Sequence, residues 1–264
     1  MTQLVHTPEA LATALPAGPI SLVPTMGALH SGHLALVRAA KALGNPVVVS
    51  IFVNPLQFAP GEDLEAYPRT LAEDVAKLET EGVDAVFAPS AETMYPYGPR
   101  TTIQPGPLGG VLEGATRPTH FAGVLTVVAK LFALTGASDA LFGEKDYQQL
   151  ALIRQMVDDL HLPVRIHGCP IVRDTDGLAL SSRNRYLSAE ERVTALAIPR
   201  ALATGSLSEA QLLLDATEGL HLDYLVATAE DMSELPDGYT GPARLLVAAK
   251  VGATRLLDNA PIEL

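Results

Sequence analysis

The chain has 264 residues, enough for one large domain or two smaller ones. Its residues are 48% hydrophobic and 18% charged, a balance that excludes extended disorder. Thirty acidic against eighteen basic residues give a formal charge of −12, which argues against sequence-independent binding to nucleic acid.

Short β-branched runs alternate with helical patterns through most of the chain. Apolar runs predict strands at residues 20–24, 47–52, 85–88, 140–142 and 164–169. Apolar residues at helical spacing predict helices at residues 32–43, 70–81, 121–134 and 147–160. Thr70 and Glu73 have the spacing of a capping box at the start of the second helix. The alternation predicts an α/β fold, a parallel sheet with helices on both faces.

The pattern changes after about Val172. Helices are predicted at residues 188–202, opened by a capping box of Ser188 and Glu191, and at residues 207–216. Short strands are predicted at residues 222–227, 245–249 and 255–257. We therefore expect two domains, residues 1–171 and a smaller α+β domain of residues 172–264. The loop at residues 89–118 is rich in Gly and Pro, a composition and length typical of binding loops.

The expected compartment is the cytoplasm. Cys169 is the single cysteine, so no intramolecular disulfide can form. The first sixteen residues have no cationic start of the kind that opens a secretory signal. The longest apolar stretch, residues 121–137, is interrupted by Lys130 and is too short to span a bilayer. We expect a soluble protein with no membrane partner.

The segment PTMGALHSGH, from Pro24 to His33, is the most specific pattern in the chain. It follows a predicted strand and opens a predicted helix, where backbone N–H groups and the helix dipole bind anions. Gly27 and Gly32 allow the backbone to approach a phosphate closely. His30 and His33 are three residues apart, so both can donate hydrogen bonds to a phosphate that gains charge in a transition state.

Two other interpretations of the histidine pair stay open here. It could be half of a metal site, although no cysteine or third histidine lies nearby in the sequence. It could also be a helix cap with incidental histidines. The glycine pattern and the strand–helix context favour catalysis over both.

Three more polar clusters follow predicted strands or open the second domain. Ligands of open α/β sheets bind beyond the carboxyl ends of the strands. The first cluster contains Asn54 and Gln57, the second contains Lys145 and Gln149, and the third contains Ser181, Ser182 and Arg183. Their uncharged and cationic groups are suited to binding a carboxylate or a polyphosphate. Taken singly, these clusters could be an Asn-Pro turn, an exposed Glu-Lys-Asp turn and a Ser-rich loop.

Taken together, the motifs resemble the pantothenate synthetase family of the nucleotidyltransferase superfamily, which carries a His-x-Gly-His signature. They are, in chain order, PTMGALHSGH, FVNPLQF with DLEAYPRT, PTHFAGVLTVVAKL, FGEKDYQQL, DGLALSSRNRYL and ARLLVAAKVGATRLLDN. The resemblance spans residues 24–259. Residues 203–241 carry no motif that can be assigned.

The resemblance implies a Rossmann-like first domain and a smaller second domain that closes over ATP. It implies ATP-dependent condensation of pantoate with β-alanine through pantoyl adenylate, with magnesium, in a homodimer. His33, His30, Lys145 and Arg183 would be catalytic. Pantoate and β-alanine would contact Gln57, Gln149, Asn54, Arg117 and His120. The ATP site would comprise Met26, Gly27, Ala28, Leu29, His30, Ser31, Gly32, His33, Gly143, Glu144, Lys145, Asp146, Val172, Leu180, Ser181, Ser182 and Arg183.

The chain departs from the family pattern at two places. Leu180 stands where many members have Met, and the similar volume of the two side chains predicts little effect on adenine packing. Glu73 and Asp74 stand where an Asp pair has been linked to a metal. Since Glu73 has a capping explanation, Asp74 is the candidate metal ligand, while the ATP phosphates are expected to hold most of the magnesium.

Two other functions remain as alternatives. A nucleotidylyltransferase would leave a nucleotide on its product, and the Gln57 and Gln149 motifs and the Ser-Ser-Arg loop disfavour it. A nucleotide-binding regulator without turnover is disfavoured by the presence of His30, His33 and Lys145.

Overall fold

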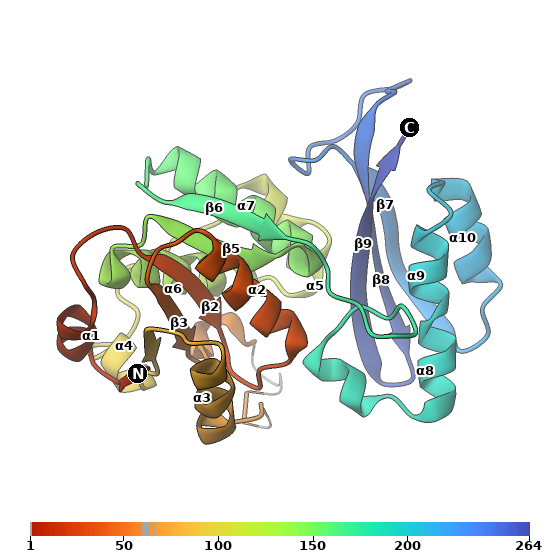
Figure 1. Cartoon of the computed structure of the whole chain (residues 1–264). Coiled ribbons are helices and arrows are strands. Elements are labelled where there is room, and N and C mark those ends of the chain that lie inside the picture. Colours follow the sequence, from red (N-terminus) through yellow and green to blue (C-terminus); the bar gives the residue numbers. More distant parts are fainter. Residues whose placement is uncertain (1, 60–63, 66) are drawn as a thin grey trace. The chain divides into compact units, whose positions relative to one another are not determined.

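A computed structural model describes residues 2–59, 64–65 and 67–264 (Figure 1). The chain divides into two compact units. One comprises the residues up to Glu144 together with Gln148–Cys169, and the other comprises Lys145–Tyr147 together with Pro170–Leu264. The tripeptide Lys145–Tyr147 therefore belongs to the second unit, although in sequence it lies between two segments of the first.

The first unit is built on a parallel sheet of six strands among the described residues. In chain order they are β1 (Gln3–Val5), β2 (Ser21–Thr25), β3 (Val47–Ile51), β4 (Ala85–Phe87), β5 (Asp139–Gly143) and β6 (Arg165–Cys169), and their order in the sheet is β1-β4-β3-β2-β5-β6. β2 pairs with β3 on one side and with β5 on the other. The strand order thus reverses at β2 and β5, the point where open α/β sheets bind ligands.

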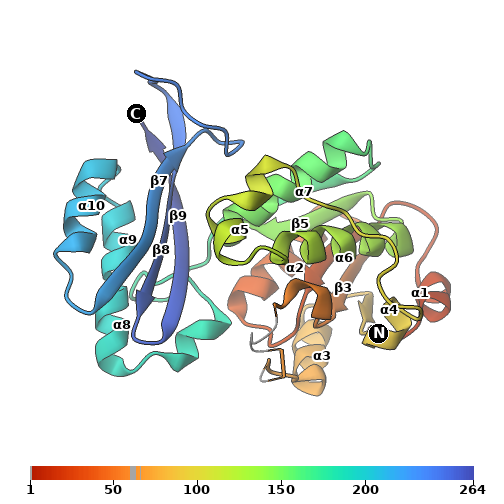
Figure 2. The ribbon, with the colours of Figure 1, turned by 180° about the vertical axis from the view of Figure 1, so that it is seen from behind.

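Helices cover both faces of this sheet, which confirms the predicted α/β architecture. The main ones are α2 (Ser31–Ala42), α3 (Leu71–Thr80), α6 (His120–Thr135) and α7 (Tyr147–Asp159). α2 and α3 lie over one face (Figure 1), and α6 lies over the other (Figure 2). Leu36, Val37 and Ala40 of α2 are buried against the strands because their spacing places them on one side of the helix.

Three parts of the first unit differ from the sequence expectation. β1 and the short helix α1 (Pro8–Ala14) precede the first predicted strand. The loop at residues 89–118 contains two short helices, α4 (Ala91–Met94) and α5 (Glu113–Thr116), and a 3₁₀ turn at Pro107–Gly110. The capping box predicted at Thr70 is wrong: its hydroxyl does not cap α3 and instead donates to Asp74 Oδ2 at 3.0 Å.

The second unit is an antiparallel sheet of three strands, in the order β7-β8-β9, with helices over one face (Figure 1). The strands are β7 (Leu220–Thr228), β8 (Pro242–Val251) and β9 (Thr254–Glu263), and the helices are α8 (Ala189–Ala195), α9 (Ala197–Leu202) and α10 (Leu207–Asp215). The capping box of Ser188 and Glu191 is confirmed. The single helix predicted at residues 188–202 is broken near Leu196, because Pro199 has no N–H to donate to the preceding turn.

A buried carboxylate ties the starts of β5 and β6 together. Asp139, whose side chain is 1% exposed, accepts hydrogen bonds from Arg165 Nε at 3.0 Å and from His167 Nε2 at 2.8 Å. Ser138 and Asn45 also donate to it. Burial raises the pKa of Asp139, but the hydrogen bonds from Arg165, His167 and Ser138 outweigh that effect and hold the pKa at about 2.

Asp139→Asn is expected to lower the free energy of unfolding most at neutral pH. The folded pKa is depressed, so the contribution of the carboxylate is fully present above about pH 4 and is lost as the pH falls to about 2. It amounts to at most about 2 kcal/mol. Urea unfolding of wild type and Asp139→Asn between pH 5 and pH 2 checks this, with the exposed Asp159→Asn as control. A difference between the two proteins that stays constant over this range would contradict it.

Candidate functional site

The turn between β2 and α2 has a backbone shape that a buried carboxylate holds in place. Gly27 and Ala28 both have left-handed conformations, with φ of 83° and 51°. The Ala28 and Leu29 N–H groups each donate to Asp74 at 2.8 Å, and Lys77 Nζ donates to the Leu29 carbonyl at 2.8 Å. Since a left-handed residue other than glycine is unfavourable, these contacts from α3 stabilise the turn.

His30 and His33 cap helix α2 through a reciprocal pair of hydrogen bonds. The Gly32 N–H donates to His30 Nδ1 at 3.2 Å, and the His30 N–H donates to His33 Nδ1 at 3.3 Å. The centres of the two rings lie 4.1 Å apart. Because each Nδ1 accepts from a backbone N–H, the proton of each neutral ring lies on Nε2.

The capping geometry is compatible with both the helix-cap and the catalytic interpretation of the histidine pair. The histidines do form a helix cap, and the same contacts fix the tautomer that presents an Nε2–H donor from each ring. Both donors lie at the N-terminus of α2, just after the carboxyl end of β2. Backbone N–H groups at such a position bind phosphate. A turn of this kind can hold an anion and donate hydrogen bonds to it.

The segment after β3 forms a 3₁₀ turn, Pro55–Gln57, that buries two amides. Asn54 is 1% exposed, and its Nδ2 donates to Gln57 Oε1 at 3.2 Å and to the Gly123 carbonyl at 3.1 Å. Its Oδ1 accepts from the Tyr95 hydroxyl at 3.0 Å. Burial raises the pKa of Tyr95 to about 12, so the hydroxyl keeps its proton and donates. Asn54 thereby orients Gln57, whose Nε2 lies 2.8 Å from Met26 Sδ.

Arg117 and His120 both form hydrogen bonds to the backbone carbonyl of Gln57. His120 Nδ1 donates to the Gln57 carbonyl at 2.9 Å, and Arg117 Nη2 donates to the same oxygen at 3.3 Å. Arg117 Nη1 lies 3.2 Å from His120 Nε2 and donates to it. Gly123 permits this packing, because a Cβ there would lie 2.3 Å from the Leu56 carbonyl oxygen. The structure thus brings Asn54, Gln57, Arg117 and His120 together.

The start of α7 carries two glutamines with different surroundings. Gln149, expected to bind substrate, is half-buried in the first turn of the helix. Its neighbour Gln148 is 3% exposed and was not singled out from the sequence. Gln148 accepts from the Glu113 N–H and donates to the carbonyls of Leu108 and Val111. It anchors the loop at residues 107–113, a role that only the tertiary contacts reveal.

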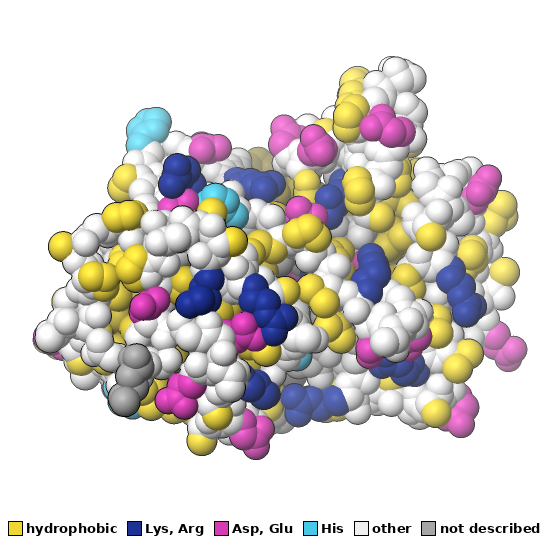
Figure 3. Space-filling view, viewed as in Figure 1, with side chains coloured by type: hydrophobic (Ala, Val, Ile, Leu, Met, Phe, Trp, Pro, Cys, Tyr) yellow, Lys and Arg dark blue, Asp and Glu magenta, His cyan; other side chains and the backbone are white. Residues whose placement is uncertain are grey.

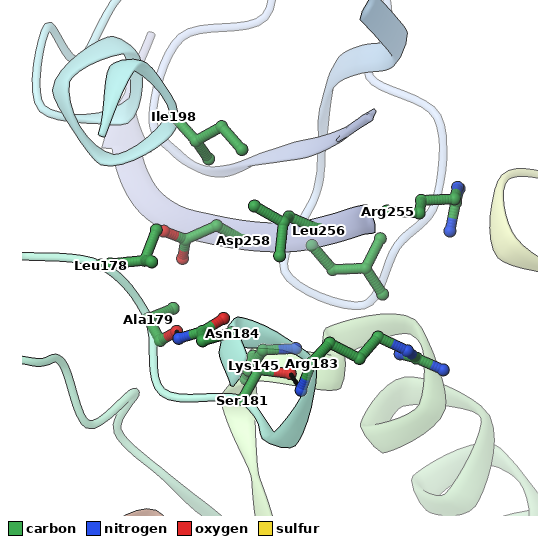
Figure 4. Close-up of a pocket in the computed structure, with 11 residues that line it drawn as sticks. Lys145, Leu178, Ala179, Ser181, Arg183, Asn184, Ile198, Arg255, Leu256 and Asp258 are labelled. Carbon is green, nitrogen blue, oxygen red and sulfur yellow. Dashed lines mark hydrogen bonds between the residues drawn. The ribbon is translucent and has the colours of Figure 1, made fainter. Parts of the chain in front are cut away.

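The second unit has a pocket of its own (Figure 4). Three of the predicted ATP-binding residues, Lys145, Ser181 and Arg183, line it, beside Arg255 and Asp258. The Lys145 ammonium lies 3.6 Å from Asp146 Oδ1, and the Ser181 hydroxyl accepts from the Arg183 N–H at 3.2 Å. Lys145, Arg183 and Arg255 outnumber the one carboxylate, Asp258, among the residues that line the pocket. Two of these cations also have acidic partners, Asp146 for Lys145 and Asp223 for Arg255.

Two further features of the second unit lie at or beside the predicted ATP residues. The Leu180 N–H donates to the Val172 carbonyl at 2.9 Å, so these two positions lie side by side. Asn184 lines the pocket, and its Oδ1 is buried without a hydrogen-bond partner among the described residues. Gly143 and Glu144, at the end of β5, belong to the first unit, whereas Asp146 belongs to the second.

Neither a metal cluster nor a membrane-spanning helix is found in the described part of the chain. No group of three or more His, Cys, Asp or Glu side chains there is placed to hold a metal ion. No helix in residues 2–59, 64–65 and 67–264 is both long and apolar enough to cross a bilayer. On the face shown in Figure 3, Lys and Arg side chains stand in small separate groups.

The comparisons with known proteins agree with one another. A family model described as pantoate-beta-alanine ligase matches residues 3–261. A relative from Corynebacterium jeikeium named pantothenate synthetase is 62% identical over 257 residues, which cover 93% of this chain and 83% of the relative.

Two solved structures are also similar. Pantothenate synthetase from Thermus thermophilus has a TM-score of 0.92 and 49% identity, over 98% of this chain and 99% of that one. Pantoate-beta-alanine ligase from Francisella tularensis, complexed with beta-gamma ATP and beta-alanine, has a TM-score of 0.84 and 36% identity, over 98% of this chain and 97% of that one. The chain belongs to the pantoate–β-alanine ligase family.

Proposed function

We propose that this chain condenses pantoate with β-alanine at the expense of ATP, and that the residues predicted from the sequence carry the reaction. A pantoate carboxylate oxygen attacks the α-phosphorus of ATP, and the bond from that phosphorus to the leaving pyrophosphate breaks. The amine of β-alanine then attacks the acyl carbon of pantoyl adenylate and AMP leaves, which gives pantothenate. Family membership supports the overall reaction.

The single observation that carries the proposal is the histidine cap at the switch point of the sheet. The first step brings two anions together and moves charge onto phosphate oxygens, so it needs positioning and fixed donors. His33 and His30 supply Nε2–H donors whose orientation the cap contacts hold. We assign His33 as the donor to the reacting phosphate and His30 as its partner.

The carboxylate substrate is assigned to the cluster around Gln57. Gln57 and Gln149 would hold pantoate, and Gln57 would also contact β-alanine. Arg117 and His120 supply positive charge or donors near the Gln57 backbone. Asn54 would act through Gln57, because its own amide is already bonded to Gln57, Gly123 and Tyr95.

Lys145 and Arg183 are assigned to the phosphates of ATP. Both line the pocket of the second unit, and Ser181 lines it with them. Lys145 acts as a point charge, whereas the planar guanidinium of Arg183 can bind a phosphate with two parallel hydrogen bonds. The remaining ATP contacts are those of the turn from Met26 to His33, of residues 143–146, and of Val172, Leu180 and Ser182.

We propose that Asp74 does not hold magnesium. The carboxylate of Asp74, the candidate ligand, is fully buried and accepts from two backbone N–H groups and the Thr70 hydroxyl. Both of its oxygens already accept from groups of the protein, so we do not assign Asp74 as a metal ligand. We propose that magnesium arrives on the ATP phosphates. We also propose a cytoplasmic homodimer, as the family resemblance implies.

Pyrophosphate–ATP exchange is expected to require pantoate and not β-alanine. The first step releases pyrophosphate before β-alanine reacts, so it reverses without the amine. The measurement is incorporation of labelled pyrophosphate into ATP, with and without each substrate. Exchange that appears only when β-alanine is added would contradict a free-standing adenylate step.

Exchange and analysis of the final products together separate the two alternatives. A nucleotidylyltransferase would keep the nucleotide on its final product, so AMP would not be released after β-alanine is added. A regulator without turnover would show no exchange under any combination of substrates. Chromatography of the products after a single turnover distinguishes both from the ligase.

A further inference from the structure

We propose that Asp258 and Asn259, consecutive residues of β9, are positioning residues that brace Lys145 and the Ser181–Arg183 loop against one strand. The inference rests on the proposed function, because it takes Lys145 and Arg183 as the cations that bind ATP. Both bracing side chains are buried, at 4% and 2% exposure. They belong to the motif ARLLVAAKVGATRLLDN, to which the sequence assigned no role.

Asn259 fixes the backbone of Lys145. Its Nδ2 donates to the Lys145 carbonyl at 3.0 Å, and its Oδ1 accepts from Arg244 Nε at 2.7 Å. The amide can face only one way, because the carbonyl only accepts and the guanidinium only donates. The Arg244 guanidinium lies over the Tyr147 ring, 4.1 Å from its centre. The Tyr147 hydroxyl in turn donates to the Glu230 carbonyl at 2.8 Å.

These contacts explain why Lys145–Tyr147 belongs to the second unit. The tripeptide joins β5 to α7 of the first unit. Its Lys145 carbonyl is nevertheless held by Asn259 of β9, and its Tyr147 ring by Arg244 of β8. Lys145 is therefore fixed relative to the pocket that it lines.

Asp258 fixes the other side of the pocket. Its carboxylate forms a two-pronged ion pair with Arg173, with distances of 2.7 and 3.0 Å. Arg173 also donates to the Gly177 carbonyl and forms a β-bridge with Ala179. The Ala179 carbonyl accepts from Asn184 Nδ2 at 2.9 Å. The segments before and after Ser181–Arg183 are thus both connected to Asp258.

The two braces are joined directly. The Asn259 N–H donates to Asp258 Oδ1 at 2.8 Å, so the carboxylate that pairs with Arg173 also orders the backbone beside the Lys145 contact. Lys145, Ser181, Arg183 and Asp258 line the same pocket (Figure 4). Donors held in place before a ligand binds stabilise developing charge without reorganisation. The pair therefore pre-sets the spacing of the backbone segments that carry the two ATP cations.

The main test uses Asn259→Asp, which keeps the shape and the acceptor for Arg244 but removes the donor to Lys145. In pyrophosphate–ATP exchange we expect the KM for ATP to rise roughly three- to tenfold, the effect of one lost hydrogen bond. The KM for pantoate should stay unchanged, because pantoate is assigned to the first unit. Amide hydrogen exchange in the absence of ATP should become faster at residues 145–147.

A second variant and a control complete the test. Asp258→Asn weakens the ion pair with Arg173, so amides at residues 178–184 should exchange faster and the KM for ATP should rise roughly tenfold or more. Thr254→Val is a buried, isosteric change on the same strand outside the network, and should leave both readouts unchanged.

The outcomes separate positioning from a merely structural role. If both variants lower thermal stability while the KM for ATP stays within twofold of wild type, the proposal is wrong. Unchanged amide exchange at both segments would also overturn it. If wild type shows no pyrophosphate exchange at all, the proposed function fails instead. The bracing contacts are still tested then by amide exchange of the free protein, where unchanged rates in both variants overturn them and faster rates support them.

Discussion

His33→Ala is expected to slow adenylate formation about 10²- to 10³-fold, the usual cost of removing one donor to a transition state. The affinity for ATP should change much less, because the charge that develops on the phosphate appears only during the reaction. Single-turnover formation of pantoyl adenylate measures the rate, and titration with ATP measures the affinity. A rate within threefold of wild type would remove His33 from the chemistry.

Loss of the helix cap must be separated from loss of the donor. His33 Nδ1 accepts from the His30 N–H, so His33→Ala also removes a capping contact, worth about 1 kcal/mol. His33→Asn keeps an acceptor near the Nδ1 position and lacks the Nε2–H. We expect it to restore most of the stability, measured by urea unfolding, and to remain as slow as His33→Ala. Recovery of the rate together with the stability would assign the histidine to capping alone.

Asp74→Ala is expected to destabilise the protein by roughly 2–4 kcal/mol, because it leaves the Ala28 and Leu29 N–H groups without their charged acceptor. The turn carries two left-handed residues that these bonds stabilise, so the KM for ATP should rise as well. Urea unfolding and pyrophosphate exchange at several ATP concentrations measure the two effects.

The dependence on magnesium distinguishes this anchoring role from metal binding. For Asp74→Asn we expect the magnesium concentration that gives half-maximal exchange to remain that of wild type. Glu73→Gln, an exposed neighbour on α3, is the control and should change neither stability nor the KM for ATP. A raised magnesium requirement in Asp74→Asn with wild-type stability would identify the carboxylate as a metal ligand.

Several elements of the fold could be predicted because their signals are local. The run Val47–Ile51 is apolar at every position except Ser50, as expected of a strand covered on both faces, and the capping box of Ser188 and Glu191 lies within four residues. The spacing at Thr70 was equally suggestive, yet its hydroxyl bonds to Asp74. There another side chain of the first helical turn, four residues on, takes the hydroxyl that the capping box would have used. β1 was missed because a three-residue edge strand has almost no periodicity.

By itself the sequence determined the α/β architecture and the family, and it supplied the candidate residues for binding a polyphosphate, because motifs and hydrophobic periods are properties of neighbouring residues. Only the tertiary structure decided what holds those residues in place. Asp74, which accepts from the Ala28 and Leu29 N–H groups, lies 46 and 45 positions from them in the sequence. Asn259, which donates to the Lys145 carbonyl, lies 114 positions from Lys145. Hydrogen bonds over such separations depend on how strands and helices pack, and a one-residue shift in register would redirect them.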